Sequence, residues 1–410
     1  MSAIPIPPVD SYAPGIVTRA PEGSVSGTST LLLAAGVIAT GASFLGLSEH
    51  KDHFVLAYLV AYMFTLSLAL GALFFVLVQH VSRAGWSIVV RRIAENMTST
   101  MVAMAILFIP IVIFSHDIWH HWMSAEIVAG KPGYDKIIAG KSGYLNETFF
   151  FVRAALYFAV WIGTAYYFRS KSVQQDETGS PELSLKMSRL GAPALVLYGF
   201  SVTFAAIDWM MSLDPHWFST MFGVTYFAGS VMAFLGMLAL LCMWMGKKGL
   251  LTDVINTEHY HDIGKLMFAF MVFWAYTNFS QYFLIQYADL PEETGWFQQR
   301  LQGNWGTIGT ALCVGHFLVP FVFLLSRHMK RNRAPLAIGA ALLLAMHWVD
   351  MQFIIFPNHS DNFHPEWVDY ALLVGLPCIF LGLTLRGISK TNLIPVRDPK
   401  LRESLKFTNI

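Results

Sequence analysis

Four titratable residues lie deep within long apolar stretches, where a charged side chain is costly to bury. They are Asp208, His316, His347 and Asp350. Each must be neutral, paired or in contact with cavity water, because an unpaired charge below the lipid headgroups costs several kcal/mol. Burial favours the neutral form of both carboxylates and imidazoles, which makes them exchangeable proton sites. We therefore predict that these four residues handle protons.

The stretch S-V-T-F-A-A-I-D-W-M-M-S-L-D-P-H-W-F-S-T, residues 201–220, shows how one of these carboxylates is placed. Asp208 comes seven residues before Pro215, which at about 1.5 Å per residue puts it roughly 10 Å inside the end of its helix. Asp214 and Pro215 are typical of a helix N-cap followed by proline at the first helical position. The alternative for Asp208 is a structural hydrogen bond to a neighbouring helix.

Further polar residues mark the same ends of the apolar stretches. Asp117 ends the third stretch, Glu147 and Arg153 begin the fourth, and Gln281 lies late in the seventh, whereas His80 lies at the opposite end. This clustering predicts a cavity that opens to one side of the membrane and is lined by Asp117, Glu147, Arg153 and Gln281. Arg153 would hold one carboxylate ionised, with Glu147 the nearer candidate in sequence. The alternative is a set of unrelated interhelical hydrogen bonds.

Three histidines follow the third stretch. His116 and His120 have the i, i+4 spacing that places two imidazoles on one helix face, and His121 is adjacent. A metal site formed by the three histidines is one interpretation, but no supporting carboxylate geometry is visible. We predict interfacial histidines and no metal.

The loop of residues 116–147 contains a ten-residue echo. A-G-K-P-G-Y at 129–134 is followed by A-G-K-S-G-Y at 139–144, which predicts a pair of turns. Glycine, proline and the aromatic rings of Tyr134 and Tyr144 suit a rigid docking surface for a partner subunit. A polar loop without a partner is the alternative.

Several cofactor classes are excluded for this chain. Cys242, Cys313 and Cys378 each lie singly in apolar runs, which is not the pattern of a zinc or iron–sulphur site. No apolar stretch carries the paired histidines of a dihaem cytochrome b, and no phosphate-binding glycine loop or nucleophile elbow occurs. We therefore expect this chain to bind no cofactor permanently.

The composition indicates an integral membrane protein. Hydrophobic residues make up 55% of the 410 residues and charged residues 13%. Ten stretches are long enough to cross a bilayer of about 30 Å. They are residues 29–47, 54–80, 97–115, 148–168, 190–211, 222–245, 262–288, 305–326, 335–356 and 367–386.

Most of the 27 basic residues fall in alternate loops and in both tails. The loops on this side include Arg83, Arg91, Arg92, Arg169, Lys171, Lys247, Lys248, Arg327 and Arg331. By the positive-inside rule this places both termini in the cytoplasm. We predict a cytoplasmic tail of residues 1–28, a membrane domain of residues 29–386 and a second cytoplasmic tail of residues 387–410.

Two classes of function fit proton-exchanging groups without an electron carrier. In one, a quinol binds in the cavity and gives its protons to a carboxylate or histidine, while its electrons pass to a partner subunit. In the other, the same groups couple an ion to secondary transport, for which discontinuous helices in matched positions would be expected.

Longer motifs carry a resemblance to a known family. S-L-D-P-H-W-F-S-T-M-F-G (residues 212–223), F-S-Q-Y-F-L-I-Q-Y-A-D-L-P-E-E-T (279–294), G-A-L-F-F-V-L-V-Q-H (71–80) and W-S-x-V-x-R-R (86–92) are similar to alternative complex III. The chain resembles the shorter of its two polysulfide-reductase-like (NrfD-like) membrane subunits, a family named for quinone binding. The resemblance extends from the first apolar stretch to the last.

The resemblance implies an all-α protein of ten transmembrane helices in the bacterial inner membrane. Spans 2–5 and 6–9 would form two four-helix bundles beside two peripheral helices. Expected partners are multihaem and monohaem cytochrome c subunits, an iron–sulphur protein, the longer sister subunit, small membrane subunits and a terminal oxidase or periplasmic carrier. Menaquinol is the implied substrate, with haem c and iron–sulphur clusters on the partners. Within such a complex this chain either contributes quinol-site or proton-conducting groups, or serves as a scaffold beside its sister.

Overall fold

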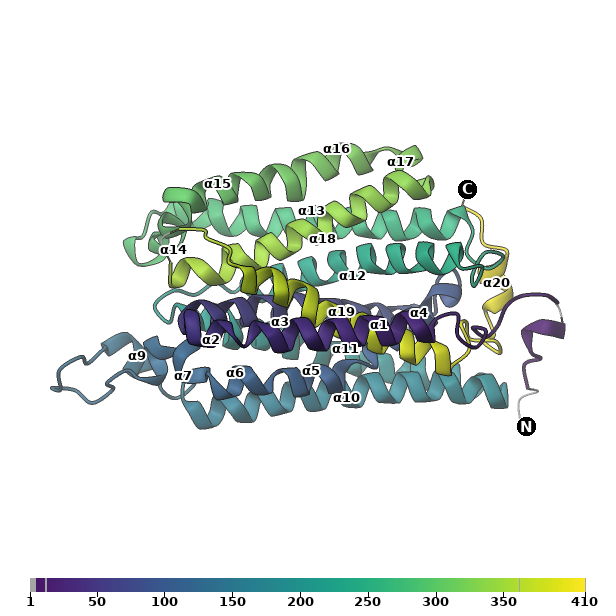
Figure 1. The fold of residues 1–410 in the computed structure, drawn as a ribbon, viewed down its shortest axis with the longest axis horizontal. Coiled ribbons are helices and arrows are strands. Elements are labelled where there is room, and N and C mark those ends of the chain that lie inside the picture. Colours follow the sequence, from purple (N-terminus) through teal and green to yellow (C-terminus); the bar gives the residue numbers. More distant parts are fainter. Residues whose placement is uncertain (1–4, 12, 361, 410) are drawn as a thin grey trace.

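The computed structural model describes residues 5–11, 13–360 and 362–409. Helices make up 77% of the chain, and the described ranges contain no strand. The long helices run side by side along the longest axis of the molecule (Figure 1). The predicted all-α membrane architecture is therefore confirmed.

Nine helical segments are long and apolar enough to cross a membrane within the described part of the chain. They are α1 with α2 (Ser26–Ser43, Gly46–Glu49), α3 (Lys51–Val81), α4 to α6 (Ile88–Thr98, Met101–Leu107, Ile109–Ile113), α10 (Glu147–Thr178), α11 with η2 (Pro181–Trp209, Met211–Leu213), α12 (Phe222–Lys247), α15 with η3 and α16 (Gly303–Leu312, Cys313–Leu318, Val319–Leu325), α18 with η4 (Arg333–Ile355, Phe356–Asn358) and α19 (Trp367–Lys390). Each matches a predicted stretch.

The seventh predicted stretch forms α13 (Thr257–Ala288), a helix of 32 residues that is not among these nine. Its first turns carry charged residues and its later turns carry Asn278 and Gln281, which lower its overall hydropathy. Its length of about 48 Å is nonetheless sufficient to span a bilayer. The tenth span thus stays a prediction that rests on length and on packing beside α12.

Two helices form the centre of the molecule. Residues of α3 are 94% buried over their most apolar window, and those of α12 are 72% buried, whereas α1 is only 22% buried. The helix α3 packs against α4, α11, α12 and α18, and α12 also packs against α13 and α18. The helices α1 and α19 pair with each other on the outside. A helix that is apolar all round, as α3 is, must be surrounded by other helices or lipid.

The remaining elements are short. They are η1 (Val9–Ser11), α7 (Ser115–Ile118), α8 (His120–Met123), α9 (Lys136–Lys141), α14 (Pro291–Leu301), α17 (Arg327–Arg331) and α20 (Leu401–Leu405). The loop that carries α9 projects from one end of the bundle, and both termini lie at the opposite end (Figure 1). Both tails contact the long helices: the backbone N–H of Ile6 donates to the carbonyl of Gly179, at the end of α10, at 2.8 Å, and α20 packs on α4. The tails also contact each other, because the N–H of Leu393 donates to the carbonyl of Thr18 at 2.8 Å.

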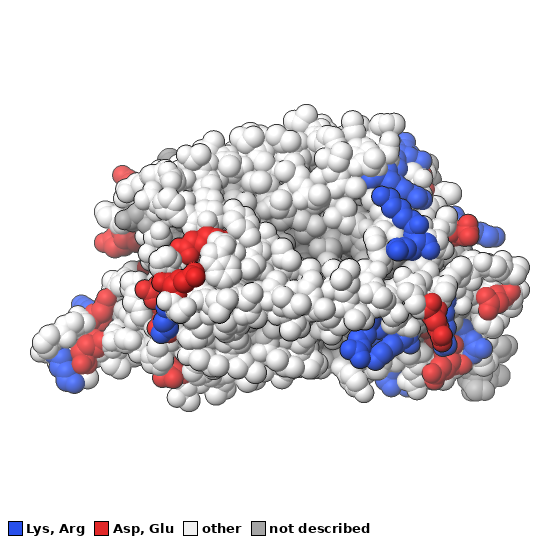
Figure 2. Space-filling view, viewed as in Figure 1, with Lys and Arg blue, Asp and Glu red and all other residues white. Residues whose placement is uncertain are grey.

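Charged side chains gather at the two ends of the molecule on the face that Figure 2 shows, and Lys and Arg are most numerous at the end with the termini. A broad uncharged band lies between these ends. Many large apolar side chains in the long helices are exposed, including Leu31, Ile38, Ile106, Tyr166 and Val322. Exposed apolar surface of this extent marks the lipid-facing part of a membrane protein.

One prediction about the charges is wrong. Arg91 and Arg92 lie inside α4 and are buried, not in a loop. Arg91 pairs with Asp398 of the C-terminal segment at 2.7 Å, Arg92 pairs with Asp176 of α10 at 2.9 Å, and both contact Glu95. Three carboxylates therefore neutralise two guanidinium groups, and these ion pairs offset the free-energy cost of burying the charges.

Candidate functional site

The helices α3 to α6, α10 and α11 pack together and are called the first bundle here, and α12, α13, α15, η3, α16 and α18 pack together as the second bundle. A cavity of about 620 Å³ lies within the second bundle, among α12, α13, α14, α15, η3 and α18. Its walls are mainly aromatic and aliphatic. They include Tyr226, Trp274, Tyr276, Phe279, Tyr282, Trp296, Phe297, Leu312, Phe317, Leu318 and Phe353. The polar groups among the lining residues include Thr225, Asn278, Gln281, Arg300 and Asp350. This size and composition are typical of a site for a small organic ligand.

The cavity borders on the lipid-facing surface. Tyr276 and Phe279 of α13 and Leu318 of η3 line it, and all three are exposed on the outside of the bundle. An apolar ligand dissolved in the bilayer can therefore reach the cavity from the side, between α13 and η3.

Asp350 of α18 is the carboxylate of this cavity. It is 4% exposed, and the indole N–H of Trp274 donates to its Oδ2 at 2.9 Å. Across the described ranges, no Lys, Arg or His side chain forms an ion pair with it. The residue is thus placed to exchange a proton with a ligand rather than to neutralise a fixed cation.

His316 lies behind Trp274. Its ring centroid is 4.0 Å from that of Trp274, and neither ring nitrogen has a hydrogen-bond partner among the described residues. It belongs to η3, a π-helical segment that widens the helix by one residue per turn. Single π-helical turns of this kind occur frequently at functional sites.

His347 connects this group to the centre of the molecule. Its Nε2 lies 3.0 Å from the hydroxyl of Ser67 in α3, and its ring centroid lies 6.3 Å from that of His316. Gly229 of α12 provides the space, because a Cβ there would lie 2.9 Å from Cε1 of His347. Asp350, His316 and His347, three of the four predicted proton-handling residues, are therefore brought into one cluster.

Asp208, the fourth, lies in the other bundle. Arg153 of α10 donates to both of its carboxylate oxygens, at 2.7 Å from Nε and 3.0 Å from Nη2, and the hydroxyl of Tyr157 donates at 2.7 Å. Asp208 is fully buried and Arg153 is 8% exposed. A bidentate guanidinium–carboxylate pair of this geometry fixes the orientation of both side chains.

The structure divides the four predicted cavity residues. Gln281 lines the cavity, and its amide donates to the hydroxyl of Thr225 at 2.9 Å. Arg153 binds Asp208 and not Glu147, and it does not line this cavity. Asp117 pairs with Lys51 at 2.8 Å, and Glu147 is exposed beside His116 at 3.6 Å. The prediction that Asp117, Glu147 and Arg153 line the same cavity as Gln281 is wrong.

The reason for the Glu147 error is geometrical. Six residues along an α-helix correspond to a rotation of about 600°, so Glu147 and Arg153 point to different faces of α10. Helix-face neighbours are three or four residues apart, not six.

The loop of residues 116–147 folds back on the turn of residues 210–221. Asp135 caps α9 by accepting from the N–H groups of Ile137 and Ile138, and it pairs with His216 at 2.6 Å. The hydrogen bond from the Ile138 N–H and the contact with His216 lower the pKa of Asp135. Burial lowers the pKa of Lys141, whose ammonium donates to the carbonyl of Pro215.

The predicted pair of turns is present in this loop. The backbone N–H of Tyr134 donates to the carbonyl of Lys131 at 3.2 Å, and the N–H of Tyr144 donates to the carbonyl of Lys141 at 2.9 Å. The surroundings differ, because Gly130 and Gly133 of the first copy have positive φ, whereas the second turn directly follows the end of α9.

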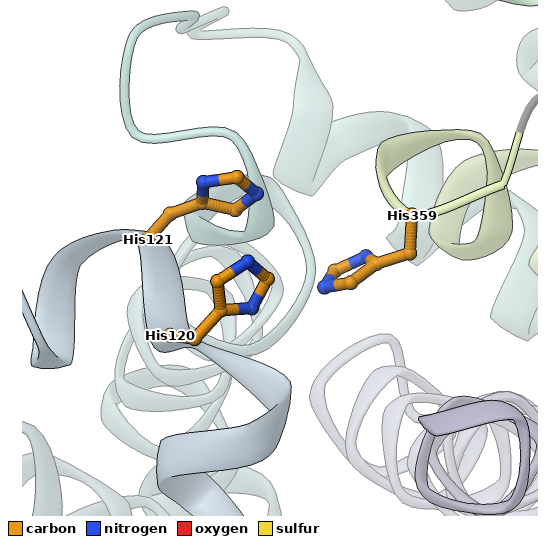
Figure 3. Close-up of side chains that lie close together, drawn as sticks. All are labelled: His120, His121 and His359. Atoms are coloured by element: carbon orange, nitrogen blue, oxygen red, sulfur yellow. The ribbon is translucent and has the colours of Figure 1, made fainter. Parts of the chain in front are cut away.

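The loop histidines are also arranged differently from the sequence expectation. The chain breaks at Trp119 into α7 and α8, so the i, i+4 relation of His116 and His120 does not put them on one helix face. His120 and His121 instead face His359, which follows η4 (Figure 3). Burial and the two neighbouring imidazoles lower the pKa of His359 to about 4.

Three cavity residues were not singled out from the sequence. Trp274 looks like an ordinary apolar residue of a span, and Trp296 and Arg300 belong to α14, which is too short to be recognised as part of the bundle. Arg300 is fully buried and donates to the carbonyls of Trp296, Phe353 and Ile354. One signal was available: Arg300 is a basic residue between two apolar stretches on the side of the membrane where few occur.

In comparisons with known proteins, no family model and no curated protein matches this chain. The fold and the cavity define a multi-pass, all-helical membrane protein with a laterally accessible apolar site.

Proposed function

We propose that this chain is the quinol-binding membrane subunit of a respiratory quinol:acceptor oxidoreductase of the alternative complex III type. One observation carries the proposal: the cavity is apolar, opens toward lipid, and has at its inner wall a carboxylate without a cationic partner. The motif runs noted above support the same class of respiratory complex, and two of them, residues 212–223 and 279–294, include residues that line this cavity.

The cavity suits the chemistry of a quinol. Its volume of about 620 Å³ lies within the usual range for small-molecule sites. Aromatic rings such as Trp296, Phe297 and Phe353 offer flat surfaces for a quinone ring, and the amide of Gln281 offers a polar contact for a quinol oxygen. The lipid-facing opening would accept the isoprenoid tail.

Oxidation of a quinol releases two protons and two electrons and leaves a quinone. Asp350 would accept each proton from a quinol hydroxyl and release it to water before the next transfer. The electrons would pass to a redox centre on a partner subunit, such as an iron–sulphur cluster or a haem. The N–H of Trp274 would hold the carboxylate in position for the transfer.

Asp208 would serve a different purpose. Its two hydrogen bonds from Arg153 and one from Tyr157 occupy the carboxylate, so it would hold α10 and α11 together. In this proposal the first bundle is the structural half of the subunit and the second bundle is the reactive half.

The assay is quinol oxidation by the complete complex purified from native membranes. Asp350→Asn keeps the shape and a hydrogen-bonding group but removes the proton acceptor, so turnover should fall by about 100-fold or more. Asp117→Asn is the matched control, because Asp117 is a carboxylate outside the cavity that pairs with Lys51. It should assemble and turn over as the wild type does.

Two results would contradict the proposal. If the chain purifies without stoichiometric partners that carry haem c or iron–sulphur absorbance, the assignment to a respiratory complex fails. If Asp350→Asn assembles and oxidises quinol at the wild-type rate, the cavity is not the quinol site and the chain is a scaffold within the complex.

A further inference from the structure

Three imidazoles converge at the end of the molecule opposite the termini. His120 and His121 belong to α8, and His359 follows η4, so residues far apart in sequence meet at one point (Figure 3). One ring nitrogen of each lies within 4.8 Å of the others. The ring centroids are 4.0 Å apart for His120 and His121, 5.2 Å for His120 and His359, and 5.9 Å for His121 and His359.

The ring nitrogens of His359 need a partner. Both are inaccessible to solvent, and neither makes a hydrogen bond of good geometry with a described residue. A buried polar atom without a partner is rare and costs free energy, and an ion is one of its recognised explanations. The carbonyl of Ile118 lies beside the ring and is suited to accept one N–H while the other nitrogen faces His120 and His121.

Both sides of the cluster are held in place. Arg300 donates to Oδ1 of Asn358 at 3.1 Å, and the indole of Trp305 donates to the carbonyl of Ser360 at 2.8 Å, which fixes the turn around His359. On the other side, the buried rings of Trp119 and Trp122 pack against Phe150 and fix α8. Such support is what a ligand set requires in order to bind tightly.

We propose that His120, His121 and His359 bind one divalent transition-metal ion of the kind that prefers imidazole ligands, such as Zn²⁺. Three neutral imidazoles and no carboxylate among the three ligands disfavour Ca²⁺ and Mg²⁺, which prefer oxygen. Zinc–nitrogen bonds of about 2.0–2.1 Å require ligand atoms about 3.3 Å apart in a tetrahedral site. His120 and His121 are exposed, so their side chains are free to rotate inward by the difference.

A fourth position remains for water or for a group from another subunit. Asp214 is close enough to His121 to act on it electrostatically, and its negative charge would offset part of the metal's charge. The metal would tie the loop after the third span to the loop after the ninth, and so connect the two bundles beside the cavity. This inference does not depend on the quinol proposal.

The experiment counts zinc in the protein purified from native membranes, with any partners that remain bound to it. The preparation is stripped with a chelator, titrated with Zn²⁺ against a competing chelator dye, and analysed by mass spectrometry for bound metal. Wild type should bind one more tightly held zinc per copy of this chain than the His359→Ala variant does. Affinity at this site should fall by more than about 100-fold in His120→Ala or His359→Ala, because even outer-shell changes cost about 10- to 100-fold.

His116→Ala is the matched control. His116 is in the same loop and is exposed beside Glu147, but it is outside the cluster. It should bind zinc as the wild type does. His120→Ala shows whether loss of zinc results from loss of a ligand or from misfolding. Because the His120 side chain is exposed, its removal leaves the core intact, and without zinc the thermal midpoint of this variant should equal that of the wild type.

Zinc should raise the thermal midpoint of the wild type and of His116→Ala, but not that of His120→Ala or His359→Ala, because a ligand that binds only the folded state stabilises it. Equal zinc content in wild type and His359→Ala would overturn the proposal. So would loss of the zinc in His116→Ala.

Discussion

Each bundle places a carboxylate near the end of its fourth helix, but the two carboxylates have different hydrogen-bond partners. Asp208 in α11 and Asp350 in α18 both come seven residues before a proline, Pro215 and Pro357. Asp208 is bound on both oxygens by Arg153, with Tyr157 as a third donor. Asp350 accepts from Trp274 and faces a cavity. The two carboxylates thus share a position along their helices, and the side chains that contact them decide what each can do.

The helices next to each carboxylate explain this difference. In the first bundle, α10 supplies a guanidinium that fills the space beside Asp208, and the rings of Tyr144 and Phe149 cover it at 3.9 and 4.4 Å. In the second bundle, Asp350 has beside it the indole of Trp274, which contacts His316 on the π-helical turn, and the aromatic walls of the cavity. A closed ion pair stabilises helix packing, whereas a carboxylate beside a cavity is available for chemistry.

The largest expected effect is on the free energy of unfolding, which should fall much more when Asp208 is replaced than when Asp350 is replaced. Asp208→Asn leaves the buried Arg153 without its counter-charge and should destabilise the protein by about 3–5 kcal/mol. Asp350→Asn removes no ion pair and should change stability by less than about 1 kcal/mol. Thermal unfolding of both variants in the same detergent measures this, and similar losses in the two would break the comparison.

A double variant tests the cause of that loss. Arg153→Met with Asp208→Asn removes both charges and should recover a substantial part of the stability lost in Asp208→Asn. No recovery would mean that shape rather than charge holds α10 against α11.

The next effect concerns the indoles beside the two carboxylate sites. Trp274→Phe removes the N–H that holds Asp350 and should lower quinol turnover by about 10- to 100-fold, since hydrogen bonds to charged groups contribute about 1.5–3 kcal/mol. Trp161→Phe is the first-bundle counterpart, because its N–H donates to Ser201 at 2.9 Å. It should lower stability without changing turnover per assembled complex. A turnover loss of the same size in Trp161→Phe would remove the functional distinction between the bundles.

The positions of nine spans in the described part of the chain were predictable, because apolar runs of sufficient length have few alternatives in a membrane. Helix ends were not, since α10 continues to Thr178, ten residues past the end of its apolar run at residue 168. There Asp176 pairs with the buried Arg92, a contact with a distant segment that periodicity does not reveal. Burial of Arg91 and Arg92 was missed for the same reason.

Three titratable residues of the site could be predicted from the sequence, but their arrangement in space could not. Depth within apolar runs identified Asp350, His316 and His347, yet their assembly depends on Trp274 and on the π-helical turn at Cys313–Leu318. That turn departs from the regular 3.6-residue period on which helix-face arguments rest. Likewise, the His120, His121 and His359 cluster joins two loops, and no spacing rule relates residues 121 and 359.

A smaller effect is expected from filling the space beside His347. A methyl group in Gly229→Ala would meet Cε1 of His347 at 2.9 Å, so the ring must move and stability should fall by about 1–2 kcal/mol. Gly163→Ala in α10 is the matched control, because nothing lies within 4 Å of its added Cβ. The control should gain about 0.5–1 kcal/mol from reduced backbone freedom. Equal behaviour of the two variants in thermal unfolding would show that the His347 pocket is loosely packed.

The smallest effect concerns the cover of the first bundle, where Asp135 holds α9 against His216. The pKa of Asp135 is lowered in the folded protein by the Ile138 N–H and by His216, so this contact stabilises the loop fully above the ordinary aspartate value of about 3.9. The stabilisation is lost as the pH falls through the lower folded value. Asp135→Asn keeps the helix cap but removes the charge, and should cost less than about 1 kcal/mol.

Pulsed hydrogen exchange at the Ile137 and Ile138 amides, corrected for intrinsic rates, should show protection at pH 5 that decreases toward pH 3 in the wild type and a weaker pH dependence in the variant. Unchanged protection across this range would mean that α9 is held by its apolar contacts and not by Asp135.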